Sequence, residues 1–325
     1  MVSVKDTQVN NNLIFDMSSD NNKSFANSFR VLLFYKYVTI DNAKEMMEIH
    51  RSVCGVLDLK GRIIIAEEGI NGTVEGEFSN TEKYITFIKK DKRFKNMDIK
   101  VSNGTGNAFP KLSVKVRNEI VGTKFPKHID PRKNTARHIL ADELKKMYEN
   151  NEDFVVVDMR NDYELASGQF KNTVNIGLKN SRDLVTPEVM EKLRIHKDKK
   201  IVAVCTGGVR CEKMASYLVD QGFKNVNQLY NGIHSYMEKF PGQDWLGTLY
   251  TFDQRVTMHF GGDRKIIGTC TDCKEETEDY YDMDENYIDE NGNKRKIDTH
   301  VLLCVLCAEV RGATLHASRK ENVLA

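Results

Sequence analysis

The sequence predicts a multidomain protein of mixed α/β and α+β class, with an N-terminal ferredoxin-like domain, a central α/β domain with a parallel sheet, and a C-terminal cysteine-rich region. Three observations lead to this fold class. The chain has 325 residues, more than one hydrophobic core usually organises, because domains cluster at about 100–150 residues. Residues 29–102 follow the order strand, helix, strand, strand, helix, strand. From residue 138 helices alternate with uninterrupted apolar strands, the pattern of a parallel sheet covered on both faces.

The composition is that of an ordinary globular protein, with 40% hydrophobic and 29% charged residues. Residues 1–24 are polar and rich in Asn, and they lack the basic and long apolar segments of a secretory signal. We expect residues 1–26 to be a flexible tail. The longest apolar runs, such as 154–157 and 201–205, fall far short of the roughly 20 residues that span a bilayer. We therefore expect a cytoplasmic protein with no membrane partner.

We assign residues 27–110 to the ferredoxin-like domain, in which two helices cover one face of an antiparallel sheet. Gly69 and the Asn71-Gly72 pair are placed at the turn between its second and third strands, because positive φ costs little for Gly and is tolerated by Asn. The predicted strands are 29–38, 61–68, 70–76 and 97–102, and the predicted helices are 41–57 and 79–90.

A basic connector, residues 111–137, is predicted to hold one or two short strands and to join two domains. Pro110, Pro126 and Pro131 punctuate it. The net charge of the whole chain is only +1, so a case for nucleic acid must rest on this local patch. A solvated linker that is incidentally positive is the other interpretation. The basic residues of the connector are Lys111, Lys115, Arg117, Lys124, Lys127, Arg132, Lys133 and Arg137.

Residues 138–245 form the predicted central α/β domain. Cys205 ends its second buried strand and precedes a helix that Gly222 closes. In open α/β sheets this edge is where ligands bind. The predicted strands are 154–160, 200–205 and 226–230, and the predicted helices are 139–150, 186–194, 211–221 and 232–240.

The loop after Cys205 favours an activated thiolate. A thiolate at a helix N-terminus is stabilised by the helix dipole and by unpaired backbone N–H groups. Gly207 and Gly208 lack Cβ atoms, so successive amides can converge on one anion. Arg210 adds a permanent charge that supports a sulfur anion or binds an incoming anionic group. Two other interpretations are a buried structural thiol and a cysteine phosphatase, in which five residues rather than four separate the cysteine from the arginine.

Motifs around this loop carry a family resemblance. The segment VVVDMRNDYE resembles the rhodanese signature Asp-x-Arg-x-x-x-Glu through Asp158, Arg160 and Glu164. The central domain therefore resembles a rhodanese-like domain whose active-site cysteine matches Cys205. With RIIIAEEGINGTVEG, CTGGVRCEKMASYL, FDQRVTMHFG and the paired cysteines that follow, the chain is similar to the bacterial oxygen-dependent tRNA uridine hydroxylase family of rhodanese-containing proteins.

The resemblance implies hydroxylation of uridine 34, the wobble position in the anticodon loop of tRNA, to 5-hydroxyuridine. Molecular oxygen is the implied co-substrate, with an electron donor that the sequence does not identify. No flavin, haem or nucleotide motif is seen. The resemblance also implies that Cys205 is the catalytic cysteine and carries a persulfide. Its implied active-site loop is Thr206, Gly207, Gly208, Val209 and Arg210.

Three further residues are expected to support this site. Asp158 and Arg160 lie at a strand end, where we expect them to pair with each other or to brace the loop. Cys211 follows Arg210 and is a candidate to resolve an oxidised Cys205, although neighbouring positions at a helix start point in different directions.

Two other functions are weighed against hydroxylation. One is a sulfurtransferase that moves sulfane sulfur from thiosulfate or a sulfur-donor protein through a Cys205 persulfide. The other is a non-catalytic RNA-binding module whose rhodanese-like domain is a relic. An intact Cys205 and Arg210 argue against the second.

The C-terminal region, residues 246–325, contains two Cys-x-x-Cys pairs. Four thiolates in tetrahedral array form a closed structural zinc site, although the segment between the pairs is longer than usual. Unmetallated thiols and a redox pair are the alternatives, and an odd total of seven cysteines argues against a disulfide framework. The four cysteines are Cys270, Cys273, Cys304 and Cys307.

Chemistry on a uridine requires an unpaired base, usually held on an aromatic platform with basic residues on its phosphates. The basic residues of the connector are the candidates for the phosphate contacts. The candidate stacking partners are Phe109, which lies just before the connector, and Phe125, which lies within it.

Overall fold

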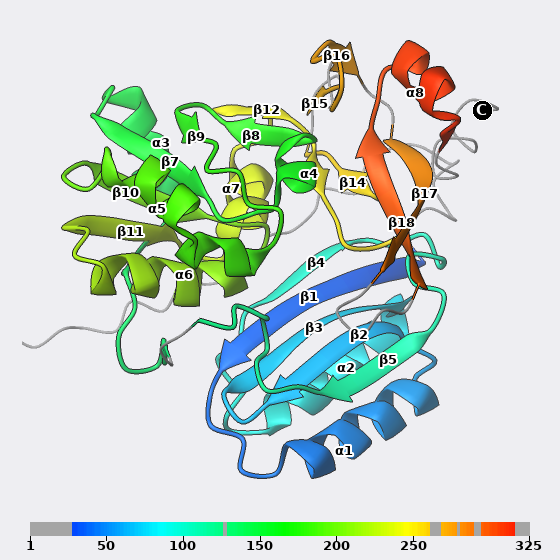
Figure 1. The fold of residues 1–325 in the computed structure, drawn as a ribbon. Helices are drawn as coiled ribbons and strands as arrows, with labels where there is room; N and C mark the ends of the chain where they lie inside the picture. The colour runs from blue at the N-terminus through cyan, green and yellow to red at the C-terminus, as the bar shows by residue number, and fades with distance from the viewer. Residues whose placement is uncertain (1–27, 126–128, 261–267, 278–279, 289–293, 316–325) are drawn as a thin grey trace, which may run out of the picture.

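The computed structural model describes residues 28–125, 129–260, 268–277, 280–288 and 294–315. The predicted tail 1–26 and the predicted phosphate contact Lys127 lie outside the described residues. Three parts are visible in Figure 1: an N-terminal sheet with two helices, a central α/β domain, and a C-terminal β-ribbon with one helix. The predicted fold class is confirmed.

The N-terminal domain has the strand order β4-β1-β3-β2-β5. The antiparallel core of this sheet and its two helices follow the predicted order of elements, because apolar residues alternate along each strand and recur every third or fourth residue in each helix. The elements are β1 (Phe29–Tyr37), α1 (Ala43–Val56), β2 (Lys60–Ala66), β3 (Gly69–Glu77), α2 (Phe78–Lys90), β4 (Ile99–Asn103) and β5 (Leu112–Val116).

Two details of this domain differ from the sequence prediction. The β2–β3 turn is Glu67–Glu68, so Asn71 and Gly72 lie inside β3 and not in a turn. A Cβ at Gly72 would lie 2.4 Å from the Phe34 ring, so this glycine serves close packing between neighbouring strands. The strand β5 falls within the predicted connector and pairs in parallel with β2, which places the first part of that segment in the N-terminal sheet.

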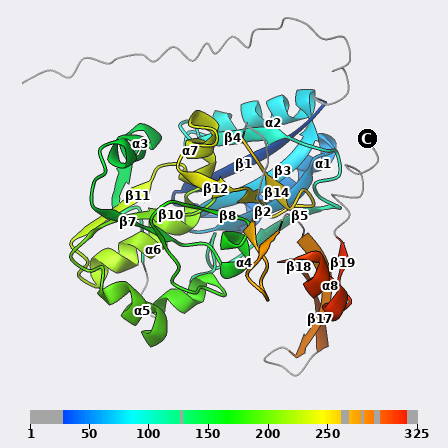
Figure 2. The same ribbon diagram turned by 90° about the horizontal axis from the view of Figure 1, so that it is seen from above.

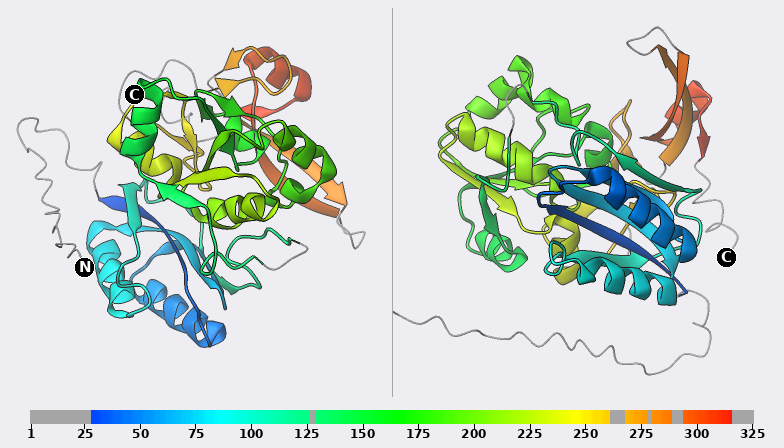
Figure 3. Two further views of the ribbon diagram at one scale, coloured as in Figure 1. Left: turned by 90° about the vertical axis from the view of Figure 1, so that its left-hand side faces the viewer. Right: turned by 90° about the horizontal axis from the view of Figure 1, so that it is seen from below.

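The two faces of the N-terminal sheet have different neighbours. Leu32, Phe34 and other alternate residues of the strands pack under α1 and α2, which cover the face seen from below (Figure 3). The opposite face carries Leu33 and Tyr35 and is turned toward the central domain (Figure 1). Period-two alternation therefore assigns one set of side chains to the core and the other to a domain interface.

The central domain is built on a fully parallel five-stranded sheet with the order β6-β11-β10-β7-β9. One apolar core lies beneath α5 and α6 and another beneath α3 and α7, so helices cover both faces (Figure 2). The strands are β6 (Arg137–Ile139), β7 (Phe154–Asp158), β9 (Thr173–Val174), β10 (Lys200–Val204) and β11 (Asn225–Leu229). The helices are α3 (Ala141–Glu149), α4 (Asp162–Leu165), η1 (Ser181–Val185), α5 (Pro187–Arg194), α6 (Val209–Asp220) and α7 (Gly232–Lys239).

Short antiparallel pairs lead from the central domain into the C-terminal region, which carries the ribbon of β17 and β18 followed by α8 (Figure 2). The pairs are β8 (Gly168–Phe170) with β12 (Trp245–Gly247), β13 (Leu249–Tyr250) with β14 (Thr257–Met258), and β15 (Gly268–Thr269) with β16 (Glu276–Thr277). The last elements are β17 (Tyr280–Ile288), β18 (Lys294–Leu302), α8 (Val305–Arg311) and β19 (Thr314–Leu315). Among the described residues, no helix is long and apolar enough to cross a membrane.

Candidate active site around Cys205

Cys205 follows β10 directly and lies at the start of the loop that enters α6. Its side chain is buried, with 0% exposure. Gly208, the residue before α6, has φ +99°, a left-handed conformation that glycine adopts without strain. This conformation turns the Gly208 N–H toward Cys205 Sγ, to which it donates a hydrogen bond of 3.2 Å. The predicted cradle of backbone N–H groups around the sulfur is therefore present.

The surroundings of Cys205 stabilise its thiolate. Burial alone raises the pKa of this thiol, but the Cys211 thiol, the Arg210 charge and the backbone N–H groups of Cys211 and Arg210 outweigh burial and lower the pKa to about 6. The second thiol behaves in the opposite way, because burial and its hydrogen bond to Cys205 raise the pKa of Cys211 well above its usual value. One thiol of the pair is therefore an anion near neutral pH, and the other stays protonated and donates to it.

Arg210 contacts a carboxylate as well as supporting the sulfur. Its guanidinium forms a bidentate ion pair with Glu164, at 2.6 and 2.7 Å, and contacts Thr206 Oγ1 at 3.3 Å. Both charged groups are buried. Bidentate pairing fixes the plane of the guanidinium. Glu164 entered the sequence analysis only as a member of the rhodanese signature, and the structure shows that it positions Arg210.

Asp158 and Arg160 pair with each other, as predicted. Arg160 Nη2 lies 2.7 Å from Asp158 Oδ2, and neither side chain is exposed. Arg160 also donates to the carbonyl oxygens of Glu164 and Gly168, at 3.1 and 2.6 Å, and lies over the Trp245 ring. These bonds tie β7, α4 and β8 together beneath the loop. The pair braces the segment that carries Glu164.

The N-terminal sheet covers the Cys205 loop. A Cβ at Gly207 would lie 3.0 Å from Leu33, and one at Gly208 would lie 2.8 Å from the Tyr35 hydroxyl. The Tyr37 hydroxyl donates to the Val209 carbonyl at 3.2 Å. The loop glycines thus serve a second purpose that the sequence did not reveal, because they let another domain approach the sulfur closely.

A second cation reaches this site from the N-terminal domain. Lys100 of β4 is 7% exposed, and its ammonium donates to Asn231 Oδ1 at 3.2 Å. Asn231 leads into α7, whose first-turn N–H groups, those of Ile233 and His234, donate to the carbonyls of Cys205 and Thr206 at 3.0 and 3.1 Å. Sequence reasoning missed Lys100 because nothing near it in the chain marks it. Its place opposite Leu33 in the β1–β4 register is the only sign, and it requires the fold.

The basic residues of the connector do not gather around Cys205. Two of them are held in ion pairs, Arg132 with Asp130 and Arg137 with Glu143. The other described ones are exposed, and they are Lys111, Lys115, Arg117, Lys124 and Lys133.

One of the two predicted stacking partners is buried, and the other is half-buried against a neighbouring ring. Phe109 is buried beside Val31 and Ala108. Phe125 packs on the Tyr217 ring, with centroids 4.9 Å apart. The prediction was wrong for Phe109, because the core takes up its ring, and it stays a prediction for Phe125.

The four cysteines of the C-terminal region converge as predicted. Their sulfur atoms all lie within 4.8 Å of one another, and Cys273 Sγ lies 3.6 Å from Cys304 Sγ. Tetrahedral zinc with Zn–S bonds of about 2.3 Å separates its sulfur ligands by about 3.8 Å, so the four thiols fit a metal ion. The Thr271 N–H bonds the Leu302 carbonyl at 2.9 Å, which joins the two Cys-x-x-Cys segments despite their distance in the chain.

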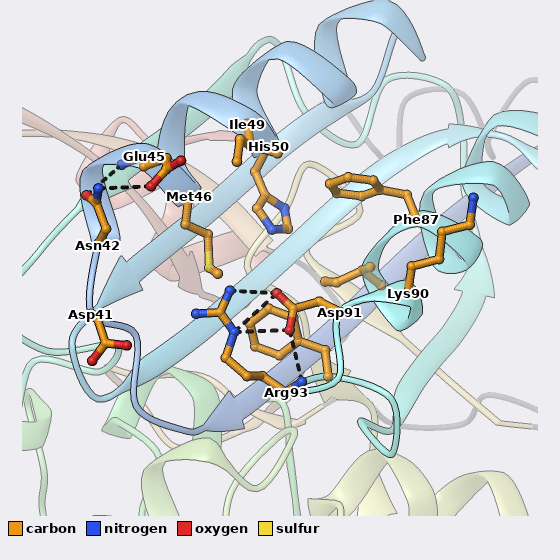
Figure 4. A pocket seen from close by; sticks show the side chains of 12 residues that line it. Asp41, Asn42, Glu45, Met46, Ile49, His50, Phe87, Lys90, Asp91 and Arg93 are labelled. Carbon is orange, nitrogen blue, oxygen red and sulfur yellow. Dashed lines mark hydrogen bonds and ion pairs between the residues drawn. The ribbon is translucent and has the colours of Figure 1, made fainter.

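A separate pocket of about 640 Å³ lies between α1 and α2, on the helical side of the N-terminal sheet (Figure 4). Several of its polar groups pair with one another or with nearby residues. Arg93 pairs with Asp91 at 2.6 Å, and His50 Nδ1 lies 2.8 Å from the Tyr84 hydroxyl. None of the predicted site residues lines it, and the sheet separates it from Cys205.

Comparisons with known proteins find relatives of both the N-terminal and the central domain. Residues 29–120 match the model of the UPF0176 acylphosphatase like domain, and residues 140–239 match the model of the rhodanese-like domain. A protein of Staphylococcus carnosus named tRNA uridine(34) hydroxylase is 40% identical over 74% of this chain and 75% of its own length. A Staphylococcus aureus protein of the same name is 38% identical over 74% of this chain and 76% of its own length. A crystal structure of a rhodanese-related protein from Thermoplasma volcanium is 28% identical, covers 34% of this chain and 97% of that chain, and has a TM-score of 0.26.

Proposed function

The chain belongs to the tRNA uridine(34) hydroxylase family, and from this premise we propose that it hydroxylates uridine 34 in the anticodon loop of tRNA to 5-hydroxyuridine, with Cys205 as its catalytic residue. The observation that carries the assignment to Cys205 is the cradle around its sulfur. A thiol with its pKa near 6, hydrogen-bonded by Gly208 and close to Arg210, is a nucleophile at neutral pH.

The proposed chemistry uses the sulfur anion to activate the uracil ring. Addition of this anion to C6 forms a C–S bond and moves the electrons of the C5–C6 double bond onto C5, which then bonds to one atom of molecular oxygen. Two electrons and two protons from the donor break the O–O bond, which leaves a hydroxyl group on C5 and releases the other atom as water. Loss of the C5 proton and expulsion of the sulfur restore the double bond. Overall, one atom of molecular oxygen enters the C5–H bond and the other becomes water, with two electrons and two protons from a donor.

Each residue of the site has a proposed part in this reaction. Gly208 and the backbone N–H groups that follow it hold the sulfur anion, and Arg210, fixed by Glu164, supplies positive potential beside it. Asp158 and Arg160 are positioning residues that brace the segment carrying Glu164. Cys211 donates to the Cys205 sulfur, and this hydrogen bond favours a stabilising role for it over that of a resolving thiol.

Replacing Cys205 tests the proposal. Cells that lack the protein should lose 5-hydroxyuridine from their tRNA, the wild-type gene should restore it, and Cys205→Ser should not, because a hydroxyl does not ionise in this cradle. Cys54→Ala removes a thiol buried in the N-terminal core and is the matched control that should restore it. Mass spectrometry of tRNA nucleosides is the measurement. Full restoration by Cys205→Ser would refute the role of Cys205, and loss of thiolated uridine alone would indicate sulfur transfer instead.

The family resemblance also bears on the state of the sulfur and on the cell compartment. We propose that Cys205 reacts as a persulfide, which is a stronger nucleophile than a thiol, and that a sulfur-donor protein loads it by transferring one sulfane sulfur to the Cys205 thiolate and leaving with a thiol. Because the substrate is tRNA, the proposed location is the cytoplasm.

Zinc is the metal that we propose for the C-terminal thiols, because a set of four sulfurs without a free position suits a structural ion. Cys270, Cys273, Cys304 and Cys307 would hold it. The ion would join the turn between β15 and β16, which carries Cys270 and Cys273, to the start of α8. Elemental analysis of the purified protein should find about one equivalent of zinc, and Cys273→Ser with Cys304→Ser should remove it. Less than half an equivalent in the wild-type protein would overturn the assignment.

The exposed basic residues of the connector are proposed phosphate contacts, with Lys124 as the first to test. Reversing its charge with Lys124→Glu should weaken tRNA binding equally for all sequences and flatten the salt dependence of the affinity. Lys197→Glu, on the far side of the central domain, is the control. An unchanged affinity at low and high salt would remove Lys124 from the interface.

A further inference from the structure

The motif FDQRV, residues 252–256, forms a turn between the N-terminal and central domains, and hydrogen bonds hold this turn in place. Arg255 forms an ion pair with Asp253 at 2.6 Å and donates to Ser102 Oγ and to the Asn103 carbonyl of the N-terminal domain, at 2.9 and 2.8 Å. The Thr251 N–H closes the turn on the Val256 carbonyl at 2.7 Å. Val256 has φ +60°, a region that β-branched residues rarely occupy. Such outliers persist only where the surroundings impose them.

This turn presents an aromatic ring to solvent beside the Cys205 loop. Phe252 is 41% exposed, although its two chain neighbours, Thr251 and Asp253, are buried. Its ring centroid lies 5.5 Å from the guanidinium carbon of Arg210. The ring is therefore next to the residue that flanks the catalytic sulfur, on a turn that Arg255 bonds to the N-terminal domain.

A second exposed ring lies close by. Tyr163 of α4 is also 41% exposed and precedes Glu164, the partner of Arg210. The buried Tyr250 connects the two rings, with centroids 5.3 Å from Tyr163 and 5.5 Å from Phe252. Edge contacts of this kind hold the rings in fixed orientations. Tyr163 and Phe252 are the two exposed rings that contact Tyr250, and we define them as the aromatic platform.

A cation from the N-terminal sheet borders this platform. Arg62 of β2 is exposed, and its guanidinium donates to the Phe252 carbonyl. The charges of Arg62 and Arg210 both act on the Tyr163 hydroxyl. Exposed aromatic rings beside positively charged side chains are the surface on which single-stranded nucleic acids bind, because bases stack on the rings while phosphates meet the cations.

We propose that Tyr163 and Phe252 are the stacking platform for unpaired bases of the anticodon loop, and that Arg62 contacts an adjacent phosphate. This inference rests on the proposed function, which supplies the RNA. It explains why the FDQRV turn is braced so firmly, since a stacking ring gives affinity only if it does not have to be ordered on binding. It also places the rings that stack on bases outside the connector, where the sequence had predicted them.

The test measures binding of an unmodified anticodon stem-loop RNA by fluorescence anisotropy. Phe252→Ala and Tyr163→Ala should each raise Kd roughly tenfold, the loss expected for one stacked base, whereas Phe252→Tyr should stay within about twofold of wild type. Phe78→Ala is the matched control, because Phe78 is 45% exposed and lies under Arg30 on the helical side of the N-terminal sheet. Its Kd should not change.

An abasic RNA separates stacking from a structural effect. In these RNAs, position 34 or a neighbouring nucleotide lacks its base. For at least one of them, the wild type and Phe252→Ala should bind with the same Kd. A difference that persists for all of them would overturn the stacking role. Arg62→Gln should lower the slope of log Kd against log salt by about one, and an unchanged slope would remove the phosphate contact.

Failure of this inference and failure of the proposed function are distinguishable. If the wild-type gene does not restore 5-hydroxyuridine to cells that lack the protein, the proposed function fails. If it does restore the nucleoside but Phe252→Ala and Tyr163→Ala bind the stem-loop as wild type does, the platform alone is refuted.

Discussion

Two cations stabilise the Cys205 sulfur, and they come from different domains. Arg210 belongs to the loop, but its bidentate pair with Glu164 neutralises much of its charge. Lys100 comes from the N-terminal sheet and has no such partner at that distance among the described residues. Burial lowers the pKa of Lys100 to about 8, against the opposing effects of Asp98, Cys205 and Glu238. Its ammonium is therefore charged at neutral pH and loses its charge in mildly alkaline solution.

These two titrations predict a bell-shaped dependence of hydroxylation on pH. The pKa of Cys205 is lowered to about 6, so the thiolate is lost as the pH falls through about 6, and the Lys100 charge is lost as the pH rises through about 8. Lys100→Met should remove the alkaline limb and shift alkylation of Cys205 to higher pH. Mass spectrometry of the Cys205 peptide after iodoacetamide treatment measures that shift. Lys89→Met, on the exposed side of α2, should leave the pH profile and the alkylation of Cys205 unchanged. Identical profiles for the wild type, Lys100→Met and Lys89→Met would contradict the role of Lys100.

At the scale of elements, β1 serves both the core and the active site. Its even-numbered residues Leu32 and Phe34 pack under the helices, and its odd-numbered residues Leu33 and Tyr35 cover the Cys205 loop. A shift of one residue in register would exchange the two sets. The register is held by β3 on one side and β4 on the other. The packing between Gly72 and Phe34 is one of the contacts that specify it.

Substitution at Gly72 should therefore reduce the stability of the N-terminal sheet. Gly72→Ala places a Cβ 2.4 Å from the Phe34 ring, and overpacking of this kind costs about 1–3 kcal/mol. Phe34→Leu should recover part of that loss in the double variant, because the smaller side chain makes room for the methyl group. Urea denaturation measures the free energy of unfolding of the single and the double variant. Equal effects of Gly72→Ala in the wild-type and Phe34→Leu backgrounds would show that the clash is not the cause.

At the scale of the whole molecule, a buried ion triad joins the central domain to the N-terminal part of the chain. Lys213 of α6 lies 2.8 Å from Glu68 and 2.8 Å from Glu119, and its side chain is 2% exposed. Glu68 also accepts the Ile120 N–H at 2.8 Å. Together with Arg255, this triad holds the N-terminal sheet over the Cys205 loop. The active site thus depends on the docking of two domains.

Removal of the shared cation should destabilise the docked molecule. Lys213→Met leaves two carboxylates facing each other without a positive charge, and breaking a buried pair costs about 3–5 kcal/mol. The pKa of Glu119 is lowered, since its hydrogen bonds and Lys213 outweigh burial, so the loss should be present at neutral pH and shrink as Glu119 is protonated in acid.

Urea denaturation at neutral and acidic pH measures that loss. Lys224→Met, which breaks an exposed pair with Asp198, should leave stability nearly unchanged, because solvent screens exposed ion pairs. Equal effects of the two substitutions would show that the triad is not a stabilising link between the domains. Adding Glu68→Gln and Glu119→Gln to Lys213→Met should recover part of the stability.

Features that are local in sequence were determined by the sequence itself. The apolar runs of β7 and β10, the helical periods of α1 and α6, and the glycines between Cys205 and Arg210 are each signalled within a few residues, because backbone geometry repeats every two or 3.6 positions. Contacts between distant residues were decided only by the tertiary structure. Glu164 and Arg210 are 46 residues apart, Lys100 and Asn231 are 131 apart, and Arg62 and Phe252 are 190 apart. No local pattern encodes such pairs, because their proximity results from strand order and domain docking.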